Sequence, residues 1–278
     1  ISNVAIIAGI WLGCRYLERT RPGQSKAAFV VLALAGPYSF YLSTVYTEAL
    51  AFLFVVAGFW YWTTDRPLRA GLVGALLSAT RSVGVFIAFA FAIDFVVRYG
   101  RAAPRKLLGR PDLIVALLLV PLGLSAFMIY LYLHLGDAMA FSHAQVAWNR
   151  ELSIPLIWLL AGLARPWDLL YLWDPTGYSY FYSCCWTVLG IGLLVWLGMQ
   201  RRWAELTFGI FCVVPPLSTG LYSMPRFIAC CPLFLFAATD LLARLKGPAF
   251  LRLAILVVLA AINLCLLWAW FHGSVFVI

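Results

Sequence analysis

The chain has 278 residues, of which 64% are hydrophobic and 11% are charged, and its net charge is +9. A mean hydropathy of +0.94, with apolar runs throughout, excludes a soluble globular domain. The basic residues are spread over short loops between apolar runs, where they orient helices and meet anionic lipid headgroups, so the positive charge does not indicate nucleic-acid binding.

Ten apolar segments follow one another along the chain, each bounded by polar or helix-breaking residues. A spanning helix needs about 17–25 apolar residues, and fewer where a helix breaks or re-enters the membrane. The segments predict one transmembrane domain over residues 1–278, all-α and polytopic, with about ten transmembrane or re-entrant helices. The expected helices are 1–17, 27–42, 45–63, 70–80, 83–98, 113–134, 184–199, 206–222, 227–243 and 252–271.

The longest segment between these helices is 135–183, and it is not uniformly polar. Residues 136–151 are typical of a surface loop that contains a short helix. Residues 152–164 are apolar but too short to span, and 165–183 are rich in Trp and Tyr, which favour membrane interfaces. We therefore expect an interfacial helix and a loop lying along the outer leaflet.

Basic residues occupy every second loop, which is the positive-inside pattern of a helical membrane protein. The loops expected in the cytoplasm hold Arg19, Arg21 and Lys26; Arg66 and Arg69; Arg98, Arg101, Arg105, Lys106 and Arg110; Arg201 and Arg202; Arg244, Lys246 and Arg252. The intervening loops carry only Arg81, Arg150, Arg165 and Arg226. The alternation isolates a polar set on the non-cytoplasmic side: Tyr46, Thr47, Glu48, Arg81, His143, Gln145, Trp148 and Arg226.

The chain begins at Ile1, without an initiator Met or a cleavable signal. Ten passes would return it to its starting side, so both ends are expected to face outward. We therefore expect an upstream helix and a first outward loop in a longer protein.

The seven cysteines predict neither a disulfide framework nor a metal centre. Five of them lie in apolar runs, where Cys acts as a small hydrophobe, and the adjacent Cys184 and Cys185 lack metal-ligand spacing. No metal and no other cofactor is expected.

Three charged residues on the outward side need a physical explanation. Arg81 lies between two apolar runs, and an Arg at membrane depth costs at least about 2.5–3.5 kcal/mol on insertion scales, so an anionic partner is expected. Pairing with Glu48 and binding of a lipid-linked phosphate both satisfy this requirement. Arg226 follows a tight Ser-Met-Pro turn, where it can bind the same phosphate or extend to the headgroups. Glu48 either caps a helix dipole or orients a hydroxyl.

The segment from Gly136 to Trp148 combines aromatic and polar residues. Its His143, Gln145 and Trp148 are of the types that recognise sugars by ring stacking and hydrogen bonding, although a lone His is more often structural. Asp94 and Asp240 each precede an Arg by four residues, and helical pairing accounts for them.

In this order, the motifs resemble the PIG-V family, the GPI mannosyltransferase II group with its bacterial homologues. The matching motifs are Tyr46 to Glu48, Thr80 to Ser82, Gly136 to Trp148, and Ser223 to Phe227, and they cover most of residues 27–245. The resemblance departs at Val83, where many relatives are expected to be polar. The Trp-Asp pair that supplies the family's catalytic acid belongs to a first outward loop, expected upstream of Ile1.

The resemblance implies a bundle like that of GT-C glycosyltransferases and an inverting transfer on the non-cytoplasmic face. A hexose, with mannose favoured, would pass from a polyprenyl-phosphate donor to a lipid or glycan acceptor. Arg81 and Arg226 would hold the phosphate, Tyr46, Thr47, His143, Gln145 and Trp148 the substrate, and Glu48 would support catalysis. The location would be a bacterial inner membrane with an outward site, or the endoplasmic reticulum membrane with a lumenal site.

Two other classes of function fit a polytopic membrane chain: a transporter or lipid-carrier flippase, and a non-catalytic subunit of a glycosylation complex. A transporter needs a polar pathway at the bilayer midplane, whereas the unexplained polar residues here gather at one face. The enzyme hypothesis makes a geometric prediction. Glu48, Arg81, His143 and Arg226 should line one outward cavity.

Overall fold

Every regular element is a helix in the part of the chain that the computed structural model describes, residues 1–148, 152–173 and 177–274. The first half contains α1 (Ser2–Thr20), α2 (Lys26–Ala35), η1 (Ser39–Leu42), α3 (Glu48–Thr63), α4 (Pro67–Thr80), η2 (Ser82–Phe86), α5 (Ile87–Tyr99), η3 (Gly100–Ala102), α6 (Ala103–Leu108) and α7 (Pro111–Leu135). The second half contains α8 (Ala140–His143), η4 (Ala144–Trp148), α9 (Pro155–Leu163), η5 (Pro166–Trp173), α10 (Tyr180–Met199), α11 (Trp203–Leu217), α12 (Met224–Ala229), α13 (Pro232–Arg244) and α14 (Ala249–Phe271).

Four helical stretches are long and apolar enough to cross a membrane by length and composition: 82–108, 111–135, 180–199 and 249–271. Three shorter apolar helices, α2, α3 and α11, have 10–17 residues. The regular structure of the described residues is therefore all helical and compatible with a membrane protein. Each of the ten predicted helices has a counterpart, but the lengths do not establish ten membrane passes.

Prolines break two of the predicted helices. The helix predicted over 27–42 stops at Ala35, because Pro37 cannot donate a backbone hydrogen bond and disfavours helical backbone at Gly36. Tyr38 then takes a left-handed conformation with φ of 63°, and η1 follows. The helix predicted over 227–243 is divided in the same way before Pro232, giving α12 and α13. The helix predicted over 206–222 ends early, at Leu217.

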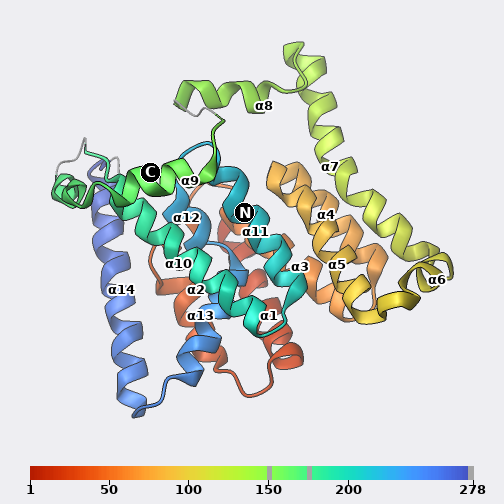
Figure 1. Ribbon diagram of the computed structural model, residues 1–278, viewed down its shortest axis with the longest axis horizontal. Coiled ribbons are helices and arrows are strands. Elements are labelled where there is room, and N and C mark those ends of the chain that lie inside the picture. Colours follow the sequence, from red (N-terminus) through yellow and green to blue (C-terminus); the bar gives the residue numbers. More distant parts are fainter. Residues whose placement is uncertain (149–151, 174–176, 275–278) are drawn as a thin grey trace.

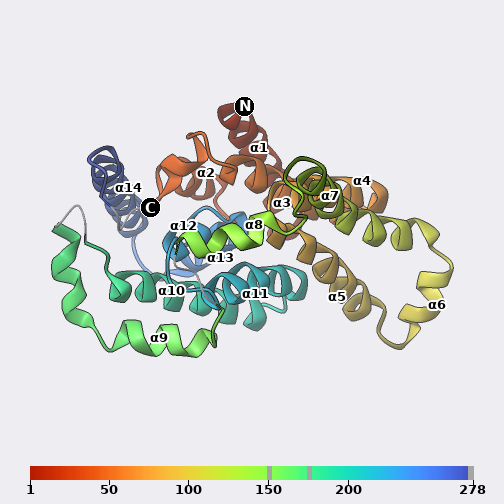
Figure 2. The same ribbon diagram turned by 90° about the horizontal axis from the view of Figure 1, so that it is seen from above.

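Three of the basic turns lie toward the same end of the molecule. In Figure 1 the turns α1–α2, α3–α4 and α13–α14 lie at the lower end, whereas α8 and α9 lie at the upper end. Figure 2, seen from above, shows α8 over the middle of the helix bundle and α6 and α14 at opposite edges. The segment predicted to hold an interfacial helix does form a helix, α9, which exposes Leu156, Ile157, Leu160 and Leu163.

Small residues let α4 and α7 pack with their backbones close together. A Cβ atom on Gly123 would lie 1.8 Å from the carbonyl oxygen of Ala75, so only glycine fits there. Between the same helices, Ser78 Oγ donates to the Val120 carbonyl oxygen at 2.6 Å and accepts from the Leu124 backbone N–H at 3.1 Å. Close approach of small residues and interhelical hydrogen bonds are what hold helices together in lipid.

Candidate functional site

Glu48 is the first residue of α3 and is almost fully buried, with 3% of its surface exposed. The helix N-terminus favours a carboxylate, but a dipole alone does not offset the burial of a full charge. Two guanidinium groups, which pair with Glu48, offset the rest of the cost of burying its charge. Glu48 Oε1 lies 3.2 Å from Arg226 Nε and 3.6 Å from Arg81 Nη2. The other oxygen, Oε2, is buried and has no hydrogen-bond partner.

Arg81 reaches Glu48 because the chain changes direction between α4 and η2. Arg81 is the residue after α4 and has extended backbone, with φ of −143° and ψ of 128°. Gly84 N–H donates to the Arg81 carbonyl oxygen at 2.8 Å and closes the turn, and a Cβ atom at Gly84 would meet Leu77 at 2.7 Å. The Arg81 guanidinium lies over the Phe227 ring at 4.9 Å. Its side chain is 29% exposed, so it keeps a free face.

Arg226 sits in the first turn of α12, beyond the left-handed Ser223. Its side chain is 13% exposed and is enclosed by three aromatic rings, with centroids at 4.9 Å for Tyr41, 5.1 Å for Tyr46 and 5.4 Å for Phe227. Ring faces attract a guanidinium. Arg226 is thus surrounded by aromatic rings and contacts the carboxylate of Glu48.

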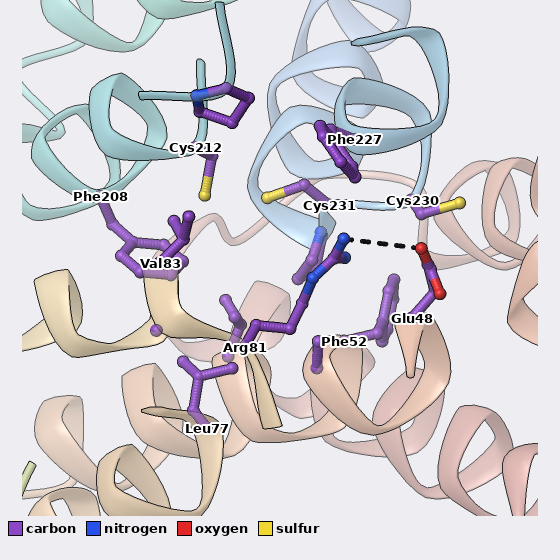
Figure 3. A pocket seen from close by; sticks show the side chains of 15 residues that line it. Glu48, Phe52, Leu77, Arg81, Val83, Phe208, Cys212, Phe227, Cys230 and Cys231 are labelled. Atoms are coloured by element: carbon purple, nitrogen blue, oxygen red, sulfur yellow. Dashed lines mark ion pairs between the residues drawn. The ribbon is translucent and has the colours of Figure 1, made fainter. Parts of the chain in front are cut away.

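A cavity of about 90 Å³, here called the Glu48 cavity, opens beside this cluster. Glu48 and Arg81 form its charged end, and Figure 3 shows the ion pair between them. Most of the remaining wall is apolar, with three thiols: Ala51, Phe52, Val55, Leu77, Val83, Gly84, Phe208, Cys212, Pro216, Phe227, Cys230, Cys231 and Pro232. The cavity therefore joins a small charged end to a long apolar wall.

Three of the four residues predicted to converge come together, although they lie far apart in the sequence. Arg226 pairs with the same Glu48 oxygen as Arg81, but it is not among the described residues that line the Glu48 cavity. Of the two arginines, Arg81 is the one that lines the cavity in the described part of the chain. The expectation that both arginines line the cavity therefore holds for Arg81 alone, and Arg226 contacts Glu48 without lining it.

The prediction that His143 lines the same cavity is wrong. His143 lies in α8, which stands apart from the bundle in Figure 1, and its side chain is 71% exposed. Its ring Nδ1 donates to Asp137 Oδ2 at 2.7 Å, and this hydrogen bond lowers the pKa of the Asp137 carboxyl below its usual value. A local partner six residues away therefore fixes this ring.

The remaining predicted substrate residues are scattered. Tyr46 covers Arg226, and Thr47 is exposed at the start of α3 without a side-chain cap bond. Gln145 Nε2 donates to the Phe141 carbonyl oxygen at 3.3 Å, close to His143 and away from Glu48. The side chain of Trp148 lies outside what the structure describes.

Sequence reasoning missed the thiols of the cavity and a second buried charge cluster. Cys212, Cys230 and Cys231 line the Glu48 cavity, but a single cysteine and an adjacent pair in apolar runs lack the spacing of a metal or redox motif. Elsewhere, Glu205 of α11 pairs with Arg21, 184 residues away. Among the described residues, no group of three His, Cys, Asp or Glu side chains is placed to hold a metal ion.

Comparison of the chain with known protein families, with curated proteins and with solved structures found no match. The resemblance to the PIG-V family therefore rests on the order of its motifs.

Proposed function

We propose that the protein is a membrane glycosyltransferase that takes a hexose, with mannose favoured, from a polyprenyl-phosphate donor. The Glu48 cavity would bind the donor, and the acceptor would be a lipid or glycan on the non-cytoplasmic face. We also propose that the chain has about ten transmembrane or re-entrant helices and that its basic loops face the cytoplasm.

The observation that carries the proposal is the charge of the cavity's polar end. One carboxylate faces two guanidiniums, so the cluster has a net charge of +1, and Arg226 already neutralises Glu48 from outside the cavity. The charge of Arg81 is left for a ligand. A polyprenyl-phosphate sugar is a phosphodiester with one negative charge, and its chain needs an apolar wall. The cavity offers one cation and such a wall.

Each charged residue then has a distinct role. In the transfer, the acceptor hydroxyl attacks the anomeric carbon, the bond from that carbon to the phosphate oxygen breaks, and the hydroxyl proton passes to a base. The leaving phosphate gains negative charge, and the fork of Arg81 matches its oxygens. Glu48 Oε2, buried without a partner, suits a hydroxyl of the sugar that donates to it. Glu48 thereby orients the donor and Arg81, while Arg226 positions Glu48.

The test measures donor binding and sugar transfer for the same variants. Radiolabelled polyprenyl-phosphate mannose is added to membranes that contain the wild type, Arg81→Ala, Arg81→Lys or Arg165→Ala. Arg165 is the matched control, because it is an exposed arginine in the outward segment and does not line the cavity. A lost charge-assisted contact should weaken donor binding by about 10- to 150-fold. Turnover should fall by about 10²–10³-fold, because the contact strengthens as the phosphate leaves.

Lysine should restore part of the loss, since it keeps the charge but not the bidentate fork. Full binding and transfer by Arg81→Ala at normal expression would contradict the proposal. Donor binding that depends on Arg81, with no transfer to any acceptor, would instead favour a non-catalytic carrier-binding protein or a flippase.

A further inference from the structure

A second cavity, of about 140 Å³, lies beside the basic turns α1–α2 and α10–α11. It is here called the Arg21 cavity. Its walls come from the α1–α2 turn, the end of α10, the α10–α11 turn and the end of α13. The lining residues are Arg21, Pro22, Gln24, Trp196, Leu197, Gln200, Arg202, Asp240 and Arg244. Three arginines and one aspartate give this lining an excess of positive charge.

Arg21 lines this cavity and has an unused hydrogen-bond donor. Its side chain is 4% exposed and pairs through Nη2 with Glu205 Oε2, while Tyr16 donates to Glu205 Oε1 at 2.6 Å. Glu205 is thus occupied on both oxygens, and the buried Nη1 of Arg21 has no partner. A buried guanidinium nitrogen without a partner is costly, and an anion in the cavity would satisfy it.

Asp240 also lines the cavity and connects several of its residues. It accepts hydrogen bonds from Gln24 Nε2 at 2.6 Å, from Trp196 Nε1 at 2.8 Å and from Arg244 Nε at 3.3 Å. Because the carboxylate can only accept, the Gln24 amide nitrogen must face it. The amide oxygen of Gln24 is therefore left as a buried acceptor without a partner. Arg202 contributes a further guanidinium, of which Nη2 donates to the Thr20 carbonyl oxygen at 2.5 Å.

These groups specify the chemistry of a ligand. With Glu205 behind Arg21, the site has three arginines and two carboxylates, a net charge of +1. One phosphodiester balances this charge, and a neighbouring hydroxyl would donate to Gln24. We propose that the Arg21 cavity binds a phosphate group that carries a hydroxylated substituent, as in the headgroup of phosphatidylglycerol. The site is separate from the Glu48 cavity and does not depend on its function.

Native mass spectrometry of the detergent-purified protein tests this assignment with two lipids that share the same acyl chains. Phosphatidylglycerol should bind more tightly than phosphatidylcholine, which lacks the hydroxyl and has no net charge. Arg202→Gln should weaken phosphatidylglycerol binding by about tenfold or more. The matched control is Arg201→Gln, because Arg201 is the adjacent, exposed arginine of the same turn and does not line this cavity. Arg244→Gln, at a half-exposed position, serves as a second variant in case Arg202→Gln does not fold.

Competition with glycerol 3-phosphate identifies the source of the phosphate. Displacement only by acylated lipid supports a headgroup site, and displacement by glycerol 3-phosphate at similar affinity supports a site for a free hydroxylated phosphate. Equal affinity for the two lipids would overturn the assignment. So would an equal loss of binding in Arg201→Gln and Arg202→Gln, because it would show that the lipid responds to general charge.

Discussion

Removal of the Glu48 carboxylate should destabilise the protein, because two guanidiniums depend on it. Glu48→Gln keeps the shape of the side chain and removes its charge. Arg226, 13% exposed and 3.2 Å away, then remains as a buried cation whose neighbours are aromatic rings. Breaking a buried ion pair by removing one partner costs about 3–5 kcal/mol. Since Arg81 is 29% exposed and can be partly hydrated, we expect a loss of roughly 3 kcal/mol, the lower end of that range.

The assay is thermal unfolding in detergent micelles, followed by intrinsic fluorescence. At about 2–4 °C per kcal/mol, Glu48→Gln should lower the midpoint by roughly 6–12 °C. The matched control is Glu18→Gln, because Glu18 is an exposed carboxylate that pairs with Lys26 at the surface, and its loss should change the midpoint little.

A double variant distinguishes the ion pair from a simple loss of packing. Glu48→Gln combined with Arg226→Gln removes both charges, so it should be more stable than the sum of the two single changes predicts. Additive losses, or a midpoint for Glu48→Gln equal to that of Glu18→Gln, would refute the reasoning.

Three other predictions concern topology, packing and pH. In a background without reactive native thiols, an impermeant maleimide added to intact cells should label Ser142→Cys and spare Arg105→Cys; the reverse pattern would show that the orientation is inverted. Gly123→Val should force α4 and α7 apart and lower the unfolding midpoint, whereas Gly192→Val, in open space on α10, should not; equal effects would show that the close approach does not matter. Because the pKa of Asp137 is lowered in the folded protein, its contact with His143 stabilises the α8 region above the unfolded-state pKa of about 4, and this stabilisation is lost as the pH falls through the lower folded-state pKa. Amide exchange in α8 should therefore rise at low pH in the wild type, and it should already be high at neutral pH in Asp137→Asn. Identical exchange in the two proteins at both pH values would contradict this.

The sequence predicted the helices and the charged cluster for physical reasons that act locally. Long apolar runs have few alternatives to a helix in lipid, and an Arg next to such a run needs a partner wherever the chain provides one. Glu48, Arg81 and Arg226 could therefore be expected together, without knowledge of the distances between them. The breaks at Pro37 and Pro232 follow from the same local chemistry and were readable in the sequence.

The remaining features depend on tertiary packing. The position of Arg226 outside the cavity depends on the aromatic rings of η1 and its neighbours, which no motif encodes. His143 was misassigned, because Asp137 satisfies it locally and removes the reason for it to reach the bundle. Arg21 and Glu205 each look ordinary in the sequence, where a basic loop residue is explained by topology and a helical Glu by solvent. Only the fold brings them together.

Photo-cross-linking with a polyprenyl-phosphate analogue that carries a diazirine near its phosphate tests the central claim most directly. After irradiation in membranes, mass spectrometry should place the modified positions on the walls of the Glu48 cavity, in peptides that contain Phe52, Val83, Phe208 or Phe227. Unlabelled polyprenyl phosphate should compete, uncharged polyprenol should compete much less, and Arg81→Ala should abolish the signal while Arg165→Ala preserves it. Cross-links confined to the lipid-exposed faces of α7 and α14 would contradict the proposal that the Glu48 cavity binds the donor. Equal competition by polyprenyl phosphate and polyprenol would also contradict it.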